Sequence, residues 1–222
     1  NGNSDAGKIE VFRYDVSSMT WAQLGGAING PGVDHRWGSN FDLSRDGNNI
    51  IAGWHEDTSR KGIVRVYELL GNTWTQVGSD FQGVSNNQQL GVSVAINAEG
   101  NIIVLGETNG LQYIGAFQAF ERNGNSWVAL GPKTLGTGNS DKIASTLDID
   151  DSGYRIITGN SGNGFGATGQ TKVYDYTPTG TSSWTQVGNS IQGTVLADIV
   201  GSSVNISGDG NTIAIGSFLQ SG

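Results

Sequence analysis

Apolar and polar residues alternate along residues 8–15, and this period of two is typical of a β-strand with one face buried. Three further segments repeat the alternation, at residues 63–68, 116–121 and 171–175. An aromatic residue followed by an acid recurs in these segments, at Tyr14, Tyr67, Phe120 and Tyr174. We therefore expect four equivalent strands with these aromatic residues in phase.

A tryptophan strand follows each of these segments after a short turn that is rich in Gly, Asn or Ser. The sequence Trp-Thr-Gln-Val-Gly occurs at residues 74–78 and 184–188, and looser copies begin at Trp21 and Trp127. The spacings between the four tryptophans are 53, 53 and 57 residues, and a period of this size predicts a repeat architecture. Because the repeats are equivalent, we expect Trp21, Trp74, Trp127 and Trp184 to be largely buried.

Two more short strands, joined by a tight turn, follow a polar loop in each repeat. The third strands are expected at residues 39–44, 92–97, 145–150 and 202–207, and the fourth strands at 49–53, 102–106, 155–159 and 212–216. One glycine of each turn repeats with the tryptophans, at Gly47, Gly100, Gly153 and Gly210. We expect positive φ at these glycines, because tight hairpin turns require it.

Four antiparallel strands in each of four units, without helical periodicity, predict an all-β chain of the β-propeller type. The units cover about residues 1–53, 54–106, 107–159 and 160–222. The chain begins just before a first strand and ends just after a fourth strand. We therefore expect residues 8–15 and 212–216 to share a terminal blade, either within one chain or between copies.

The repeats resemble FG-GAP repeats, the blades of integrin α-chain propellers. The FG step of that motif corresponds to Trp37-Gly38, Leu90-Gly91 and Val200-Gly201, and the GA step to Gly53-Trp54, Gly106-Glu107, Gly159-Asn160 and Gly216-Ser217. Ile143-Ala144 departs from the FG step, and no Gly-Ala-Pro sequence is intact. The resemblance implies an extracellular role in adhesion or scaffolding. It implies no particular ligand, and integrin-type propellers have more blades than the four units found here.

The composition excludes several functions. A net charge of −8 and a pI near 4.6 argue against nucleic acid as a partner, because phosphate binding needs clustered Lys and Arg. The absence of cysteine excludes disulfides and thiolate chemistry, and no apolar run is long enough for a transmembrane helix. Low lysine content and abundant Asn, Gly and Thr favour an extracellular protein. The start at Asn1 indicates a processed product or a window of a longer repeat chain.

Calcium is the one cofactor that the resemblance implies, because FG-GAP blades often bind it in a turn. Asp148, Asp150 and Asp151 belong to a segment that matches the opening of an Asp-x-Asp-x-Ser-Gly loop. Calcium takes six to eight oxygen ligands, but Ile156 and Gly159 stand where later acidic ligands are expected. The alternative is that these carboxylates cap a tight turn, which needs no metal.

A second candidate site is the segment Trp54, His55, Glu56 and Asp57. Trp54 is in phase with Glu107, Asn160 and Ser217, so an aromatic residue at this position breaks the polar pattern. An exposed tryptophan beside polar groups suits a sugar ring or a protein partner. The alternative is that Trp54 packs against the neighbouring blade.

We therefore expect a non-enzymatic, extracellular structural or adhesive module that binds proteins or copies of itself, in a filament or array. The alternative function is a lectin-like propeller that binds glycans. A hydrolytic propeller would need clustered carboxylates, whereas most acids here recur in phase, as structural residues do.

Overall fold

The computed structural model describes residues 6–30, 32, 37–55, 59–108, 114–137, 141–160, 168–180, 182–195 and 198–217. All regular structure in these ranges is β-strand. No helix that could cross a membrane occurs among them.

Three antiparallel sheets have four consecutive strands each, and we call them blades 1, 2 and 3. Blade 1 contains β5 (Asn40–Leu43), β6 (Asn49–Trp54), β7 (Ile63–Leu70) and β8 (Thr73–Gln76), with β9 (Phe81–Gln82) also paired to β7. Blade 2 contains β10 (Val94–Ile96), β11 (Ile102–Glu107), β12 (Ala116–Asn123) and β13 (Ser126–Ala129), with β14 (Thr134–Leu135) paired to β12. Blade 3 contains β15 (Thr146–Ile149), β16 (Arg155–Asn160), β17 (Gln170–Thr177) and β18 (Ser183–Gln192). Each sheet therefore joins the last two strands of one sequence repeat to the first two of the next.

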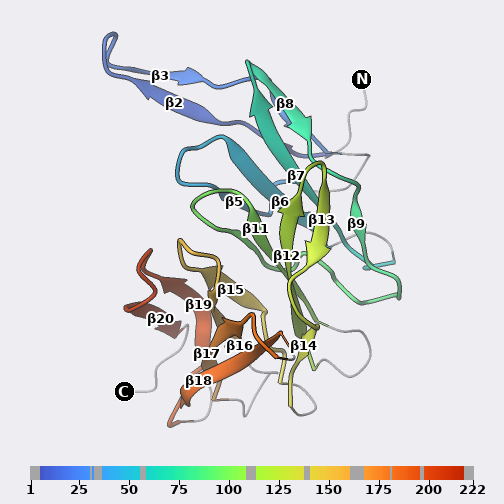
Figure 1. Cartoon of the computed structure of the whole chain (residues 1–222), viewed down its shortest axis with the longest axis vertical. Helices are drawn as coiled ribbons and strands as arrows, with labels where there is room; N and C mark the ends of the chain where they lie inside the picture. Colours follow the sequence, from blue (N-terminus) through green and yellow to red (C-terminus); the bar gives the residue numbers. More distant parts are fainter. Residues whose placement is uncertain are drawn as a thin grey trace.

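A half-blade stands at each end of the chain. The C-terminal half-blade is the pair β19 (Val200–Ile206) and β20 (Ile213–Ser217). The N-terminal half-blade contains β1 (Lys8–Ile9), β2 (Phe12–Asp15), β3 (Thr20–Gln23) and β4 (Ile28–Asn29), in which β1 pairs with β4 and β2 with β3. Figure 1 shows the two half-blades at opposite ends of the molecule, so the expected pairing of the chain ends does not occur within this chain.

The hydrophobic core lies between neighbouring sheets. Successive residues of a strand point to opposite faces, so the middle strand of a blade packs against both neighbours. In β6, Ile50 and Ala52 pack towards the N-terminal half-blade, whereas Ile51 packs towards blade 2. Every residue of β6 and β11 is buried as a result.

The turn glycines have the backbone conformation that the sequence predicts. The φ angles of Gly47, Gly100, Gly153 and Gly210 are 71°, 72°, 81° and 71°. These values lie in the left-handed region that glycine adopts without steric cost. The prediction is confirmed at all four turns.

The prediction that Tyr14 is equivalent to Tyr67, Phe120 and Tyr174 is wrong by two residues. The amide of Gly30 donates to the carbonyl of Gly7, as the amide of Gly83 donates to that of Gly62. Counting from these glycines, the counterpart of Tyr67 is Phe12, and Tyr14 is the counterpart of Leu69. The difference arises in the β2–β3 turn, which spans residues 16–19, whereas the β7–β8 turn spans only 71–72.

Candidate functional site

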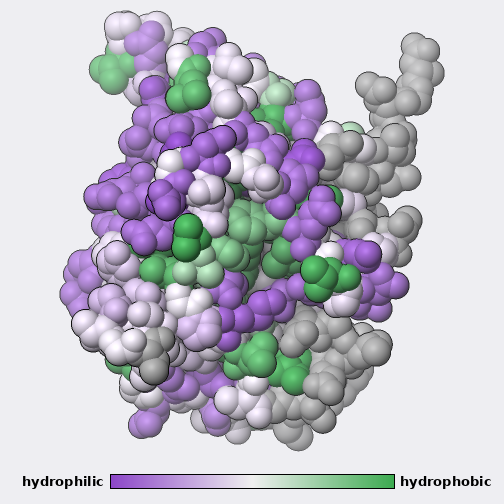
Figure 2. All heavy atoms as spheres, turned by 45° about the vertical axis from the view of Figure 1, so that its right-hand side comes forward, coloured by the Kyte–Doolittle hydropathy of each residue, from purple (hydrophilic) through white to green (hydrophobic). Residues whose placement is uncertain are grey.

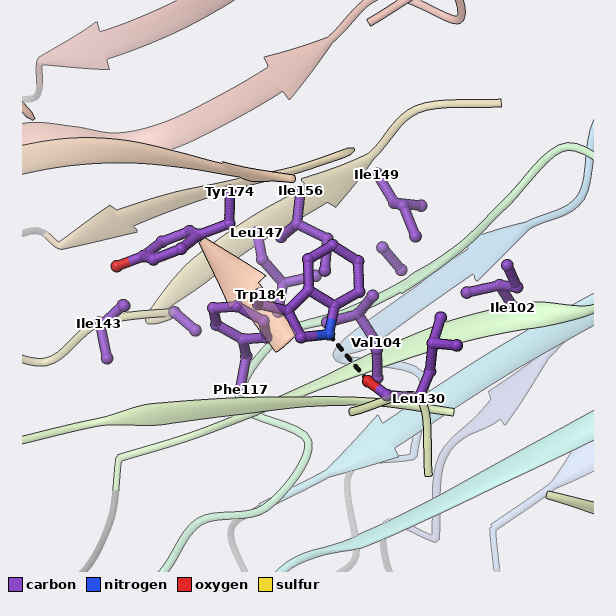
Figure 3. Close-up of a cluster of buried hydrophobic side chains, with 13 residues drawn as sticks. Ile102, Val104, Phe117, Leu130, Ile143, Leu147, Ile149, Ile156, Tyr174 and Trp184 are labelled. Carbon is purple, nitrogen blue, oxygen red and sulfur yellow. Dashed lines mark hydrogen bonds between the residues drawn. The ribbon is translucent and has the colours of Figure 1, made fainter. Parts of the chain in front are cut away.

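An indole hydrogen bond recurs wherever one blade packs on the sheet before it. The three bonds run from Nε1 of Trp74 to the carbonyl of Leu24 (2.9 Å), from Trp127 to Val77 (3.1 Å) and from Trp184 to Leu130 (2.9 Å). Figure 3 shows the last of them among the buried side chains between blades 2 and 3. Each acceptor is the third residue after the tryptophan of the preceding repeat.

A glycine follows each acceptor and leaves room for the indole ring. Gly25, Gly78 and Gly131 all have positive φ, and a Cβ atom there would lie 2.8, 3.0 and 3.5 Å from Cδ1 of the next tryptophan. Gly188 is the fourth member of this series and also has positive φ (68°). Among the described residues, nothing lies within 4 Å of a Cβ built at Gly188. Blade 3 therefore has the acceptor residue and the glycine of this contact, but no tryptophan packs against them among the described residues.

The donating half of the contact lies at the other end of the chain. Trp21 is 69% exposed, whereas Trp184 is 7% exposed. The prediction that all four tryptophans are largely buried is therefore wrong for Trp21, because no sheet among the described residues packs in front of it. Tyr14 holds the Trp21 ring at a centroid distance of 5.5 Å, close to the 5.3 Å between Tyr176 and Trp184. The interplanar angles of the two pairs are 58° and 47°, so Trp21 contacts its tyrosine much as Trp184 does in blade 3.

We call the exposed side of the N-terminal half-blade the N-terminal face; it carries Phe12, Tyr14 and Trp21. Phe12 is 49% exposed, whereas its counterparts Tyr67 and Tyr174 are buried. Figure 2 shows isolated hydrophobic side chains among polar ones at the upper end of the molecule, where Figure 1 places the β2–β3 hairpin. In the complete blades the residues at these positions are buried or half-buried, whereas all three are exposed here.

We call the opposite open side the C-terminal face; it carries Val187, Gly188, Ile191 and the free edge of β20. Val187 and Ile191 are both large apolar residues with exposed side chains. Among the described strands, β20 pairs with β19 and has no partner on its other edge. Unpaired strand edges recruit other strands, and no lysine or proline protects this one between residues 203 and 216.

A buried carboxylate marks the incomplete end of the C-terminal half-blade. In blade 3, Asp141 Oδ1 accepts hydrogen bonds from Asn160 and Gln170, and its Oδ2 lies 3.3 Å from Lys172 Nζ. Asp198 holds the same position in the next repeat and is 8% exposed. Its Oδ2 accepts from the amides of residues 194 and 195, but its Oδ1 has no hydrogen-bond partner among the described residues. In blade 3 two of these donors, Gln170 and Lys172, come from the third strand, which the C-terminal half-blade lacks.

The candidate ligand segment does not form an exposed site at Trp54. This side chain is 1% exposed and packs with Ile9 and Trp37 between blade 1 and the N-terminal half-blade. Burial against the neighbouring sheet, the alternative reading of the sequence, is therefore what the structure contains. The ring of His55 contacts the side-chain amide of Asn40 (3.3 Å), and Glu56 and Asp57 lie outside the described residues.

The three candidate calcium ligands are occupied by protein donors. Asp148 Oδ2 accepts from the amide of Ile206 (2.8 Å), and burial raises the pKa of Asp148. Asp150 Oδ1 accepts from three successive backbone amides, those of residues 153, 154 and 155, and Asp151 pairs with Arg45 of blade 1. No group of three metal-ligating side chains occurs in the described part of the chain. These contacts fit the capping role, in which the turn is satisfied by its own carboxylate.

A small pocket lies between blades 1 and 2. Its volume is about 250 Å³, and its walls include Phe81, Phe120, Glu107 and Lys133. The two phenylalanine rings are 4.7 Å apart, and Glu107 pairs with Lys133 at 2.9 Å. Trp54 occupies the position of Glu107 in the preceding repeat.

No protein-family model and no curated protein matches the sequence. Three solved structures share the fold: a candidate 6-phosphogluconolactonase from Bacteroides uniformis (TM-score 0.59, 14% identity, 96% of this chain and 58% of that one), hydrazine synthase of Kuenenia stuttgartiensis (0.57, 13%, 97% and 66%) and a hypothetical selenium-binding protein from Sulfolobus tokodaii (0.53, 14%, 86% and 50%). The chain has a β-propeller-type fold. It spans about half to two thirds of the length of these structures. At these identities the likeness concerns the fold alone.

Proposed function

We propose that this chain is a non-enzymatic, extracellular structural or adhesive module, related to FG-GAP repeats, that binds protein partners through its two terminal faces. The observation that carries the proposal is the exposure of Phe12, Tyr14 and Trp21 at positions that are buried or half-buried in the complete blades. Large aromatic residues on an accessible surface are the side chains that dominate protein interfaces. The acidic character and the absence of cysteine are compatible with an extracellular location.

A binding assay on immobilised protein tests this proposal. The wild-type chain and the double variant Trp21→Ala/Gly188→Asn are coupled to a surface and exposed to purified chain and to the secreted proteins of the organism that makes it. We expect the wild type to retain protein and the double variant to retain at least tenfold less. Equal retention by both surfaces would overturn the proposal, as would turnover of a polysaccharide, lactone or peptide substrate.

Carbohydrate binding is the second candidate function, and the pocket between blades 1 and 2 favours it. An aromatic wall formed by Phe81 and Phe120 beside the Glu107–Lys133 pair combines an apolar surface with hydrogen-bonding groups, as sugar sites do. A glycan array tests this candidate, with Phe81→Ala as the pocket variant. Glycan binding that disappears in Phe81→Ala but persists in Trp21→Ala would favour the lectin over the proposed function.

A further inference from the structure

We infer that two copies of this chain join head to tail, with the N-terminal half-blade of one copy completing the C-terminal half-blade of the next into a full blade. The inference rests on the proposed function and names its partner as a second copy of the same chain. Two contacts that recur inside the chain, and a third that occurs in blade 3, have their two halves separated at its ends.

The first contact is the strand pairing itself. In complete blades the second strand pairs with the third in one register, with Ile50 opposite Tyr67 and Ile156 opposite Tyr174. The same register places Ile213 of β20 opposite Phe12 of β2. Among the described strands, β20 pairs only with β19 and β2 only with β3, so each has one open edge. Phe12 of β2 is also exposed. A strand added at this edge gives the C-terminal half-blade its third strand.

The second contact is the indole hydrogen bond. Once the N-terminal half-blade is docked on β20, Trp21 faces blade 3 as Trp184 faces blade 2. The acceptor position is Val187, and the adjoining glycine is Gly188, which has the required positive φ and open space. The Tyr14–Trp21 ring geometry already matches the buried pair Tyr176–Trp184. Little reorganisation is therefore needed on either side of the contact.

The third contact supplies a donor for Asp198. In blade 3, Gln170 is the residue directly after Gly169 and donates to Asp141. Gly7 occupies the position of Gly169, so the residue after it, Lys8, takes the place of Gln170. The Lys8 side chain is 57% exposed, pairs with Glu10 at 2.8 Å and carries the charge that a buried aspartate requires. Glu10 takes the place of Lys172, so Lys8 is the cation of this site. Docking of a second copy thus places an ammonium group beside the carboxylate oxygen that lacks a partner.

A second copy is the occupant that we propose, because one sequence carries both halves of each contact. A head-to-tail contact of this kind uses two different surfaces, so it leaves one surface of each type free at the ends of a dimer. Assembly therefore continues to chains of copies, or closes when the accumulated rotation permits. The association is expected to depend on protein concentration.

Light scattering on the purified chain measures the assembly. We expect a mass above the 23.2 kDa of one chain that rises with concentration. Trp21→Ala and Gly188→Asn should each weaken association at least tenfold, because the first removes the indole and the second fills its site. Asn tolerates positive φ, so the second change should leave the fold intact. Gly124→Asn is the matched control, since Gly124 also has positive φ (61°) and open space but lies in the β12–β13 turn.

Cysteine cross-linking tests the register, because the chain contains no cysteine of its own. The predicted register pairs Ile215 with Glu10, and paired strand positions are close enough for a disulfide. We expect a mixture of Ile215→Cys and Glu10→Cys to form a disulfide-linked dimer at least tenfold faster than a mixture of Ile215→Cys and Ser18→Cys. Equal rates would overturn the register.

Two further outcomes separate this inference from the proposed function. A chain that stays monomeric at all concentrations, or a double variant Ile215→Cys/Glu10→Cys that cross-links only within one monomer, would overturn the second copy as partner. If either result is obtained, the proposed function still holds when the wild type retains a different protein that Trp21→Ala/Gly188→Asn does not retain.

Discussion

Strands β6 and β20 have similar sequences and opposite surroundings. Residues 50–53 read Ile-Ile-Ala-Gly and residues 213–216 read Ile-Ala-Ile-Gly, each after a turn with a positive-φ glycine. Every residue of β6 is buried, whereas none of β20 is. The difference does not come from the strands. It comes from the neighbouring sheets: β6 has a sheet packed on each of its two faces, whereas β20 has a described sheet on one face only.

The N-terminal and C-terminal faces are therefore ordinary blade surfaces without a neighbouring sheet among the described residues. The same residue types that form the core between blades form the N-terminal and C-terminal faces. Our proposal that the exposed aromatic residues bind a partner follows from this comparison, because proteins rarely leave an extended apolar face uncovered. The predictions below test the comparison, beginning with the largest expected effect.

The tryptophans give the largest contrast. Trp184→Ala should lower the free energy of unfolding by about 3–5 kcal/mol, because it removes a buried ring and its hydrogen bond. Trp21→Ala should change it by less than about 0.5 kcal/mol in the monomer, since Trp21 is 69% exposed. Urea unfolding at a concentration where the chain is monomeric gives both values. Similar losses in the two variants would contradict the distinction between complete blades and half-blades.

The glycines after the acceptors give the next contrast. Gly78→Ala and Gly188→Ala both place a Cβ at positive φ, which should cost about 1–2 kcal/mol. Gly78→Ala should cost about 1–3 kcal/mol more, because its Cβ would lie 3.0 Å from the Trp127 ring. The difference between the two unfolding free energies isolates the blade contact. No difference would mean that the ring moves away without cost.

An ion pair within blade 1 provides a smaller, pH-dependent effect. Arg65 forms two 2.8 Å hydrogen bonds to Asp80 and holds the pKa of that carboxyl below its usual value. A lowered pKa stabilises the fold above the carboxyl's unfolded pKa, and this contribution disappears as the pH falls through the folded-state value. Asp80→Asn should therefore destabilise by about 1–2 kcal/mol near neutral pH and have no effect in strong acid. Unfolding free energies measured from pH 7 down to pH 2 check this; a constant difference would exclude the carboxylate as the cause.

Calcium should have the smallest effect. Because Asp150 already caps its own turn through three backbone amides, we expect thermal melts in calcium and in chelator to coincide. Asp150→Asn should behave identically in the two conditions. A chelator-induced fall of several degrees in the wild type would establish a metal site that includes Asp148, Asp150 or Asp151.

Much of the fold follows from the sequence pattern. Alternation located the strands to within a few residues, and the glycine period located the turns. The short strands β4, β9 and β14 were not predicted, because two residues carry no period. The phase error at Tyr14 has a similar cause: the β2–β3 turn is two residues longer, and only the backbone bonds of Gly7 reveal the shift.

The candidate site was less predictable. The sequence contains the spacing of the indole contact, a tryptophan followed by its acceptor and a glycine, but nothing in the spacing shows that the bond joins different repeats. It also contains no signal that Trp54 fills a core position, since its counterparts are polar.

The sequence by itself determined what each repeat is: four strands, a glycine turn and a tryptophan with its receiving glycine. These features depend on local backbone preference and on the period of side chains, which a single segment carries. Only the tertiary structure decided which copies of these features are buried and which are open. Burial is a property of two surfaces in contact, so Trp184 and Trp21 differ only through the sheet that packs in front of one of them.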